Sequence, residues 1–119
     1  QLELGADIDI PEELTKLVPH YKHAQLVNCL TGPDAIFATY STPIREEEVF
    51  AFYEKENLVM GWEYQKSFTV AGRRMLTAQR AGKRLTITFQ EQGVDRLITV
   101  MLSDRRPEEL DLKALESDR

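Results

Sequence analysis

The spacing of apolar residues changes from about 3.6 to 2 near residue 61, which predicts a helix followed by strands. The helix is predicted over residues 43–59. Ser41 or Thr42 is its expected cap, Pro43 its first residue and Gly61 its end. The acidic run 46–48 suits the positive end of the helix dipole. The stripe expected to face a core consists of Val49, Phe52, Tyr53 and Glu56, widened by Phe50 and Leu58.

Alternating apolar and polar residues after position 61 predict four strands joined by short turns that contain glycine. The strands are expected near residues 62–68, 75–78, 85–89 and 97–102. In the first of them Trp62, Tyr64 and Phe68 are predicted to share one face, which Lys66 interrupts. Two earlier apolar runs, 24–30 and 35–41, flank a Thr-Gly-Pro-Asp turn and predict a hairpin.

The predicted fold class is α+β, with the element order β-β-α-β-β-β-β. An antiparallel sheet is expected to pack against one central helix, because no other predicted element can cover the apolar stripe of that helix. The 119 residues fit a single domain. We expect a polar lead-in over 1–23 with one helical turn after Pro11, a folded core over 24–102 and a charged tail over 103–119 that either begins a short helix at Pro107 or is mobile.

Charge is unevenly distributed along the chain. The net charge of −5 combines −7 over residues 1–61, +5 over residues 62–106 and −3 over the remaining residues. The basic middle segment is interpreted first as solubilising surface charge that discourages pairing of strand edges, with a patch for an anionic partner such as lipid head groups or an acidic protein as the alternative. The acidic total and a pI near 5.1 argue against nucleic acid. The longest apolar run, 58–62, is too short to span a membrane.

No group of residues predicts catalysis or a cofactor. His20 and His23 are spaced like two metal ligands but lack a third, so we expect neither a metal site nor a metal cofactor. Cys29 lies in a predicted strand, where nothing favours its thiolate. The helix carboxylates are expected to be solvated, and residues 70–74 lack the glycine and Lys-Ser/Thr of a phosphate loop. We therefore predict no catalytic residue.

Several segments resemble a group of small exported bacterial proteins, many of them lipoproteins. The resemblance covers about residues 18–102 and rests on the run Val18–Val27, a helix containing Phe52-Tyr53-Glu54-Lys55, and Gly61-Trp62 followed by a meander. The chain departs from the group where Lys22-His23 replace Pro-Gly. Its layout is also similar to the helix-grip domains of BamC proteins. The resemblance implies a location in the periplasm or at the outer membrane, and a non-catalytic role.

The leading functional hypothesis is a non-enzymatic cell-envelope domain that contacts another envelope protein or a ligand. The second is binding of a small apolar or lipid ligand in a cleft between helix and sheet, and an enzyme is the third. The chain starts at Gln1, so an upstream export signal or lipid anchor is an open alternative to a trimmed start. The residues predicted to contact a ligand are Trp62, Tyr64, Arg73, Arg74 and Arg84.

Overall fold

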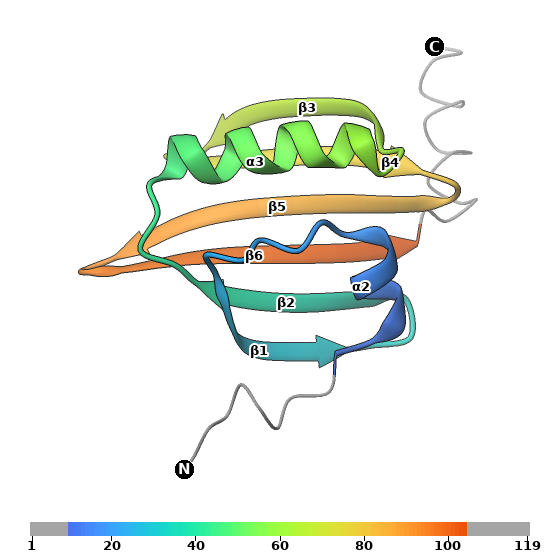
Figure 1. The fold of residues 1–119 in the computed structure, drawn as a ribbon, viewed down its shortest axis with the longest axis horizontal. Coiled ribbons are helices and arrows are strands. Elements are labelled where there is room, and N and C mark those ends of the chain that lie inside the picture. Colours follow the sequence, from blue (N-terminus) through green and yellow to red (C-terminus); the bar gives the residue numbers. More distant parts are fainter. Residues whose placement is uncertain (1–9, 105–119) are drawn as a thin grey trace.

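A computed structural model describes residues 10–104, which form one six-stranded antiparallel sheet and two helices (Figure 1). The strands lie in the order β1-β2-β6-β5-β4-β3, so the two edges are formed by β1 and β3. Their bounds are Gln25–Thr31 for β1, Ala35–Ser41 for β2, Glu63–Val70 for β3, Arg73–Arg80 for β4, Lys83–Gln92 for β5 and Asp95–Asp104 for β6. The predicted hairpin and meander are confirmed, and the long pairing of β2 with β6 joins them into one sheet.

Helix α3 (Glu46–Val59) lies across one face of the sheet, as predicted (Figure 1). Its end is a Schellman motif: Trp62 N–H donates to the Asn57 carbonyl at 2.9 Å and Gly61 N–H to the Leu58 carbonyl at 3.2 Å. Gly61 has φ +91°, which only glycine adopts without strain. The spacing of the apolar side chains therefore changes from that of a helix to that of a strand at Gly61, where the sequence predicts it.

The start of α3 differs from the prediction. Arg45, and not Ser41 or Thr42, precedes the first helical residue and makes no side-chain cap. The Thr42 hydroxyl instead donates to the His23 carbonyl at 2.9 Å and accepts from Ile44 N–H at 3.2 Å. These bonds fix a turn through Pro43, which delays the helix to Glu46.

The core lies between α3 and the sheet. Its helix side chains include Val49, Phe50 and Tyr53, while Leu58 is 65% exposed, so its predicted place in the stripe is wrong. Asn57 is buried instead, and its amide donates to the Gln65 side-chain oxygen at 2.9 Å. From the sheet, β4, β5 and β6 contribute Leu76, Ala78, Leu85, Ile87, Phe89, Ile98, Val100 and Leu102.

The segment before β1 is part of the folded unit and not merely a polar lead-in. Helix α2 (Glu12–Leu17) begins after Pro11, where one helical turn was predicted. Its Leu14 and the following Val18 and Tyr21 are buried in the same core as the α3 side chains. Tyr21 stacks on Phe52 with the ring centres 4.5 Å apart. At the other end β6 extends to Asp104, and the predicted short helix or mobile segment after Pro107 lies outside the described residues.

Both edge strands contain a bulge. The register of β1 shifts between Leu26 and Asn28, and that of β3 shifts between Glu63 and Lys66. An extra residue turns the side chains that follow it to the other face and bends the strand, which discourages pairing with another sheet edge. The bulge in β3 is the reason that Trp62, Tyr64 and Phe68 do not share a face as predicted.

Candidate functional site

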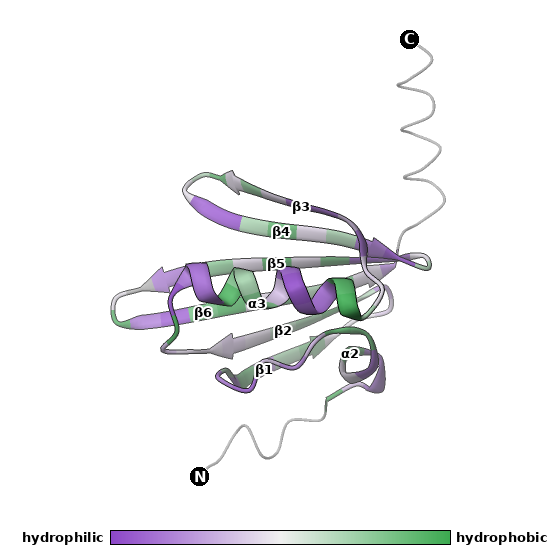
Figure 2. Ribbon diagram, turned by 45° about the horizontal axis from the view of Figure 1, so that its top comes forward, coloured by the Kyte–Doolittle hydropathy of each residue, from purple (hydrophilic) through white to green (hydrophobic). Residues whose placement is uncertain are grey.

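Both helices lie on the same side of the sheet, and no described helix covers the other side, which we call the open face (Figure 2). The pairing register defines two rows of side chains across this face. One row runs Leu30, Phe37, Met101, Thr86, Thr77 and Lys66, and the next runs Asn28, Thr39, Thr99, Thr88, Met75 and Phe68. The open face is thus a central band of threonines with methionine and aromatic side chains among them.

A hollow of about 560 Å³ lies on the open face and is lined by residues of β3, β4, β5 and β6. We call it the open-face hollow. Its volume is in the range of small-molecule sites. Its lining combines apolar and hydroxylated side chains with polar and charged ones. It is lined by Tyr64, Lys66, Met75, Thr77, Ala78, Gln79, Arg84, Thr86 and Met101.

The charge of the open-face hollow has one sign. Lys66 and Arg84 line it, and none of its lining residues is Asp or Glu. On the other side of the sheet, α3 carries five glutamates and a single lysine, Lys55. An anionic group is therefore attracted to the hollow and repelled by the glutamates of α3.

Tyr64 stands at the edge of this hollow in an unusual backbone conformation. Its φ is +56°, a left-handed value that costs a residue with a side chain roughly 1 kcal/mol. The bulge in β3 holds it there, and its side chain is 74% exposed. Strained residues of this kind cluster at ligand sites because the surrounding fold must hold them in place.

The structure separates the two aromatic residues that were predicted to line one cleft. Trp62 is 1% exposed, packs in the core and donates its indole N–H to the Leu17 carbonyl at 2.6 Å. Tyr64 lies on the opposite side of the sheet. A cleft between helix and sheet lined by both residues is therefore wrong for this structure, because the core fills the helix side.

The three arginines that were predicted to contact a ligand also lie in different parts of the structure. Arg84 lines the open-face hollow together with Tyr64. Arg73 lines an adjoining hollow at the β3–β4 turn. Arg74 points to the helix side, where its guanidinium lies 4.5 Å from the Phe50 ring centre and 3.6 Å from a Glu54 carboxylate oxygen. Arg74 therefore stabilises the packing of α3 against β4.

Sequence reasoning predicted only Tyr64 and Arg84 among the residues that line the open-face hollow, and Lys66, Met75 and Met101 are among those it missed. Lys66 was noted only as an interruption of an apolar face. The three residues come from β3, β4 and β6. A single signal in the sequence points to the site: methionine, threonine and lysine occupy alternate positions that the fold does not need for its core.

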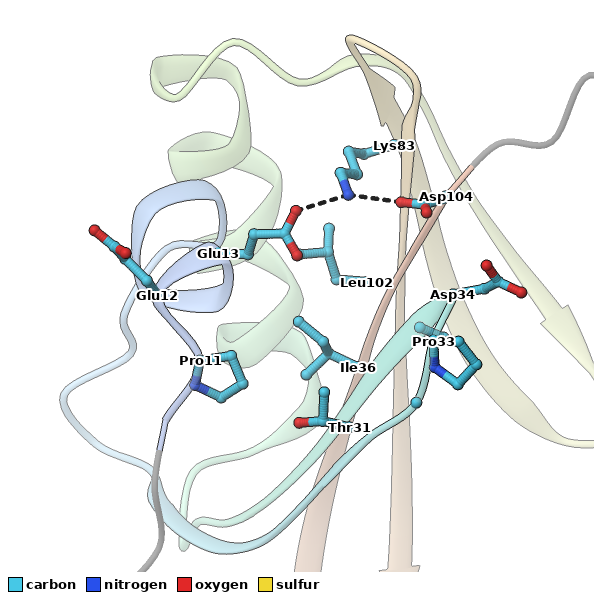
Figure 3. A pocket seen from close by; sticks show the side chains of 12 residues that line it. Pro11, Glu12, Glu13, Thr31, Pro33, Asp34, Ile36, Lys83, Leu102 and Asp104 are labelled. Carbon is cyan, nitrogen blue, oxygen red and sulfur yellow. Dashed lines mark hydrogen bonds and ion pairs between the residues drawn. The ribbon is translucent and has the colours of Figure 1, made fainter.

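A second hollow, of about 480 Å³, lies beside the start of α2 and the β1–β2 turn (Figure 3). Lys83 crosses it and pairs with Glu13 at 2.7 Å and Asp104 at 2.6 Å. The hydrogen bonds that the Lys83 ammonium donates to Asp104 and then to Glu13 raise its pKa. Lys83 forms ion pairs with both carboxylates. We therefore interpret this hollow as a structural contact that holds α2 against the sheet.

The remaining chemical candidates are not brought together. The His23 ring packs edge-on against Tyr21 with the centres 5.4 Å apart, and burial raises the pKa of the Cys29 thiol, which disfavours a nucleophilic thiolate. Within residues 10–104 no three His, Cys, Asp or Glu side chains are grouped to hold a metal ion. No helix in this part of the chain is long and apolar enough to cross a membrane.

Comparison with known families gives a match to the START domain-like family over residues 29–105, which is more than half of the chain. The chain belongs to the START domain-like family. A START domain-like assignment is consistent with a helix-grip-like α+β fold, and such domains are generally non-enzymatic ligand-binding modules. A comparison with curated proteins finds no match.

Proposed function

We propose that this START domain-like protein is a non-enzymatic module that binds a small amphipathic molecule with an anionic group in the open-face hollow. The observation that carries the proposal is a hollow with Met75 and Met101 among its lining residues, two cations, Lys66 and Arg84, and no carboxylate. Methionine adapts to irregular apolar ligands, and the cations select the sign of the polar group.

The helix–sheet interior is a less suitable place for a ligand in this structure. Trp62, Phe50, Ile87 and Val100 are all at most 1% exposed and belong to one contiguous cluster. A ligand would have to displace these side chains, and truncating such residues typically costs several kcal/mol each. The open-face hollow needs no such rearrangement.

The test is calorimetric titration of the protein with decanoate and with uncharged decanol, each below its aggregation concentration. We expect decanoate to bind more tightly. Lys66→Gln and Arg84→Gln should each weaken decanoate binding about fivefold, since one charge-assisted contact contributes about 1 kcal/mol. Lys55→Gln, on the exposed side of α3, is the matched control and should leave the affinity unchanged.

The single tryptophan reports which side of the sheet is occupied. Trp62 is buried on the helix side, so a ligand in the open-face hollow should leave its emission wavelength unchanged. A shift in Trp62 emission with no effect of the Lys66 and Arg84 variants would place the ligand in the interior. That result would overturn the proposed site.

We further propose a location in the bacterial cell envelope, for which the resemblance over residues 18–102 is the support. In that setting contact with another envelope protein is the second candidate function, and the exposed Phe37 and Leu30 on the open face favour it. Fractionation of cells that express the complete gene product tests the location. Recovery in the cytoplasm alone would contradict it.

A further inference from the structure

A smaller hollow of about 320 Å³ adjoins the open-face hollow at the β3–β4 turn, and we call it the turn hollow. It is lined by Val70, Ala71, Arg73, Met75 and Thr88. Met75 lines both hollows, so they meet at this side chain. Met75 is half-buried and pairs across the strands with Phe68 and Thr88, which places an apolar bridge between the two spaces.

Cations line both parts of the combined groove. Lys66 pairs with Thr77, and Arg73 lies four residues from Thr77 along β4. At about 3.3 Å per residue, the backbone positions of Thr77 and Arg73 are roughly 13 Å apart. Within residues 10–104, neither the Lys66 ammonium nor the Arg73 guanidinium forms an ion pair or a side-chain hydrogen bond.

Arg73 lies near two carboxylates outside the groove. Arg73 also borders a hollow of about 300 Å³ on its other side, which contains Glu46 and Glu91. Glu91 pairs with Arg96 at 3.0 Å, and neither carboxylate bonds to Arg73 in the described part of the chain. Neither hollow of the groove has an Asp or Glu among its lining residues.

We infer that the two hollows bind one linear molecule with an apolar middle and an anionic group at each end. This inference rests on the proposed function and adds a second anion contact, Arg73, to it. A chain of about ten carbons matches the roughly 13 Å between the backbone positions of Thr77 and Arg73. Lys66 and Arg84 hold one anionic group, the chain passes over Met75, and Arg73 holds the other group. The competing arrangement puts a methyl end against Val70 and Ala71.

The experiment compares decanedioate, decanoate and hexanedioate by calorimetric titration of the wild-type protein and the Arg73→Gln variant. We expect decanedioate to bind about fivefold more tightly than decanoate, and the short hexanedioate more weakly than both. Arg73→Gln should lower decanedioate affinity to that of decanoate and leave decanoate affinity unchanged. Arg45→Gln, an exposed arginine before α3, is the control and should change neither.

The outcomes separate this inference from the proposed function. If decanoate binds at least as tightly as decanedioate and Arg73→Gln changes nothing, the second anion contact is refuted while the open-face hollow stands. If neither compound binds, both proposals are refuted. Circular dichroism of the Arg73→Gln variant should match wild type, because this exposed arginine is not part of the buried core.

Discussion

Replacing Trp62 with phenylalanine should destabilise the protein more than its place in a helix-to-strand connection suggests. The indole N–H donates to the carbonyl of Leu17, 45 residues earlier in the chain, at 2.6 Å. Phenylalanine leaves that carbonyl without its donor, which costs about 2 kcal/mol. The smaller ring also leaves a void among fully buried neighbours, for about 1 kcal/mol more. We expect a loss of about 3 kcal/mol in the free energy of unfolding.

Urea denaturation followed by far-UV circular dichroism measures this loss, since the variant has no tryptophan to report by fluorescence. The melting temperature should fall by roughly 12 °C. Amide exchange should accelerate in α2, because the indole ties that helix to the end of α3. Val59→Ala, at an exposed position 73% accessible, is the control and should cost under about 0.5 kcal/mol. A loss below about 1 kcal/mol for Trp62→Phe, with unchanged exchange in α2, would refute the reasoning.

Three further predictions concern other parts of the fold. Ala81 has φ +47° in a two-residue hairpin turn, so Ala81→Asn should add about 0.5–1 kcal/mol in urea denaturation; a loss would contradict the assigned turn. Lys83→Met should cost about 1 kcal/mol at pH 7. The pKa of Lys83 is raised by folding, so this difference should persist at neutral pH and disappear as the pH rises through that raised pKa, and a pH-independent difference would argue against the ion pairs. Asn57→Asp should cost more than about 3 kcal/mol at pH 7 and less in acid, because burial favours the neutral carboxyl; equal losses at both pH values in thermal melts would count against it.

Local chemistry made the meander and the end of α3 predictable from the sequence. Glycine follows alanine at the β3–β4 and β4–β5 turns, and both turns have positive φ at the alanine and at the glycine. Gly61 ends α3 because its left-handed φ allows the Trp62 and Gly61 amides to bond back to the helix. Each of these signals is complete within a few residues, so the rest of the fold is not needed to interpret it.

Long-range contacts account for the features that the sequence did not predict. Leu14, Val18 and Tyr21 are sparse apolar residues in a polar segment, and their burial depends on α3 and on the bond from Trp62 to Leu17. The bulge in β3 adds one residue to a pattern with a period of two, which reverses the face of every predicted side chain on one side of it. Periodicity alone cannot locate such an insertion.

The candidate site was predictable in part for the same reason. Tyr64 and Arg84 were both expected to contact a ligand, and both line the open-face hollow. Trp62 was assigned to the same cleft as Tyr64 because the alternation of apolar and polar residues does not reveal the bulge in β3. Lys66 and Met101 were missed because they come from β3 and β6, at opposite sides of β4 and β5 in the sheet order, and only the pairing register brings them together.

The two faces of the sheet divide stability from binding, which makes the binding tests interpretable. The residues that close the core, such as Leu76 and Ile87, alternate along β4 and β5 with Thr77 and Thr86 of the open face. A substitution at Lys66, Arg73 or another exposed side chain of the open face removes no buried contact, so its expected effect on unfolding is within about 0.5 kcal/mol. A change in ligand affinity in these variants therefore reports on the hollow itself. A domain with its ligand inside the core would lack this property, because every contact residue there would also support the fold.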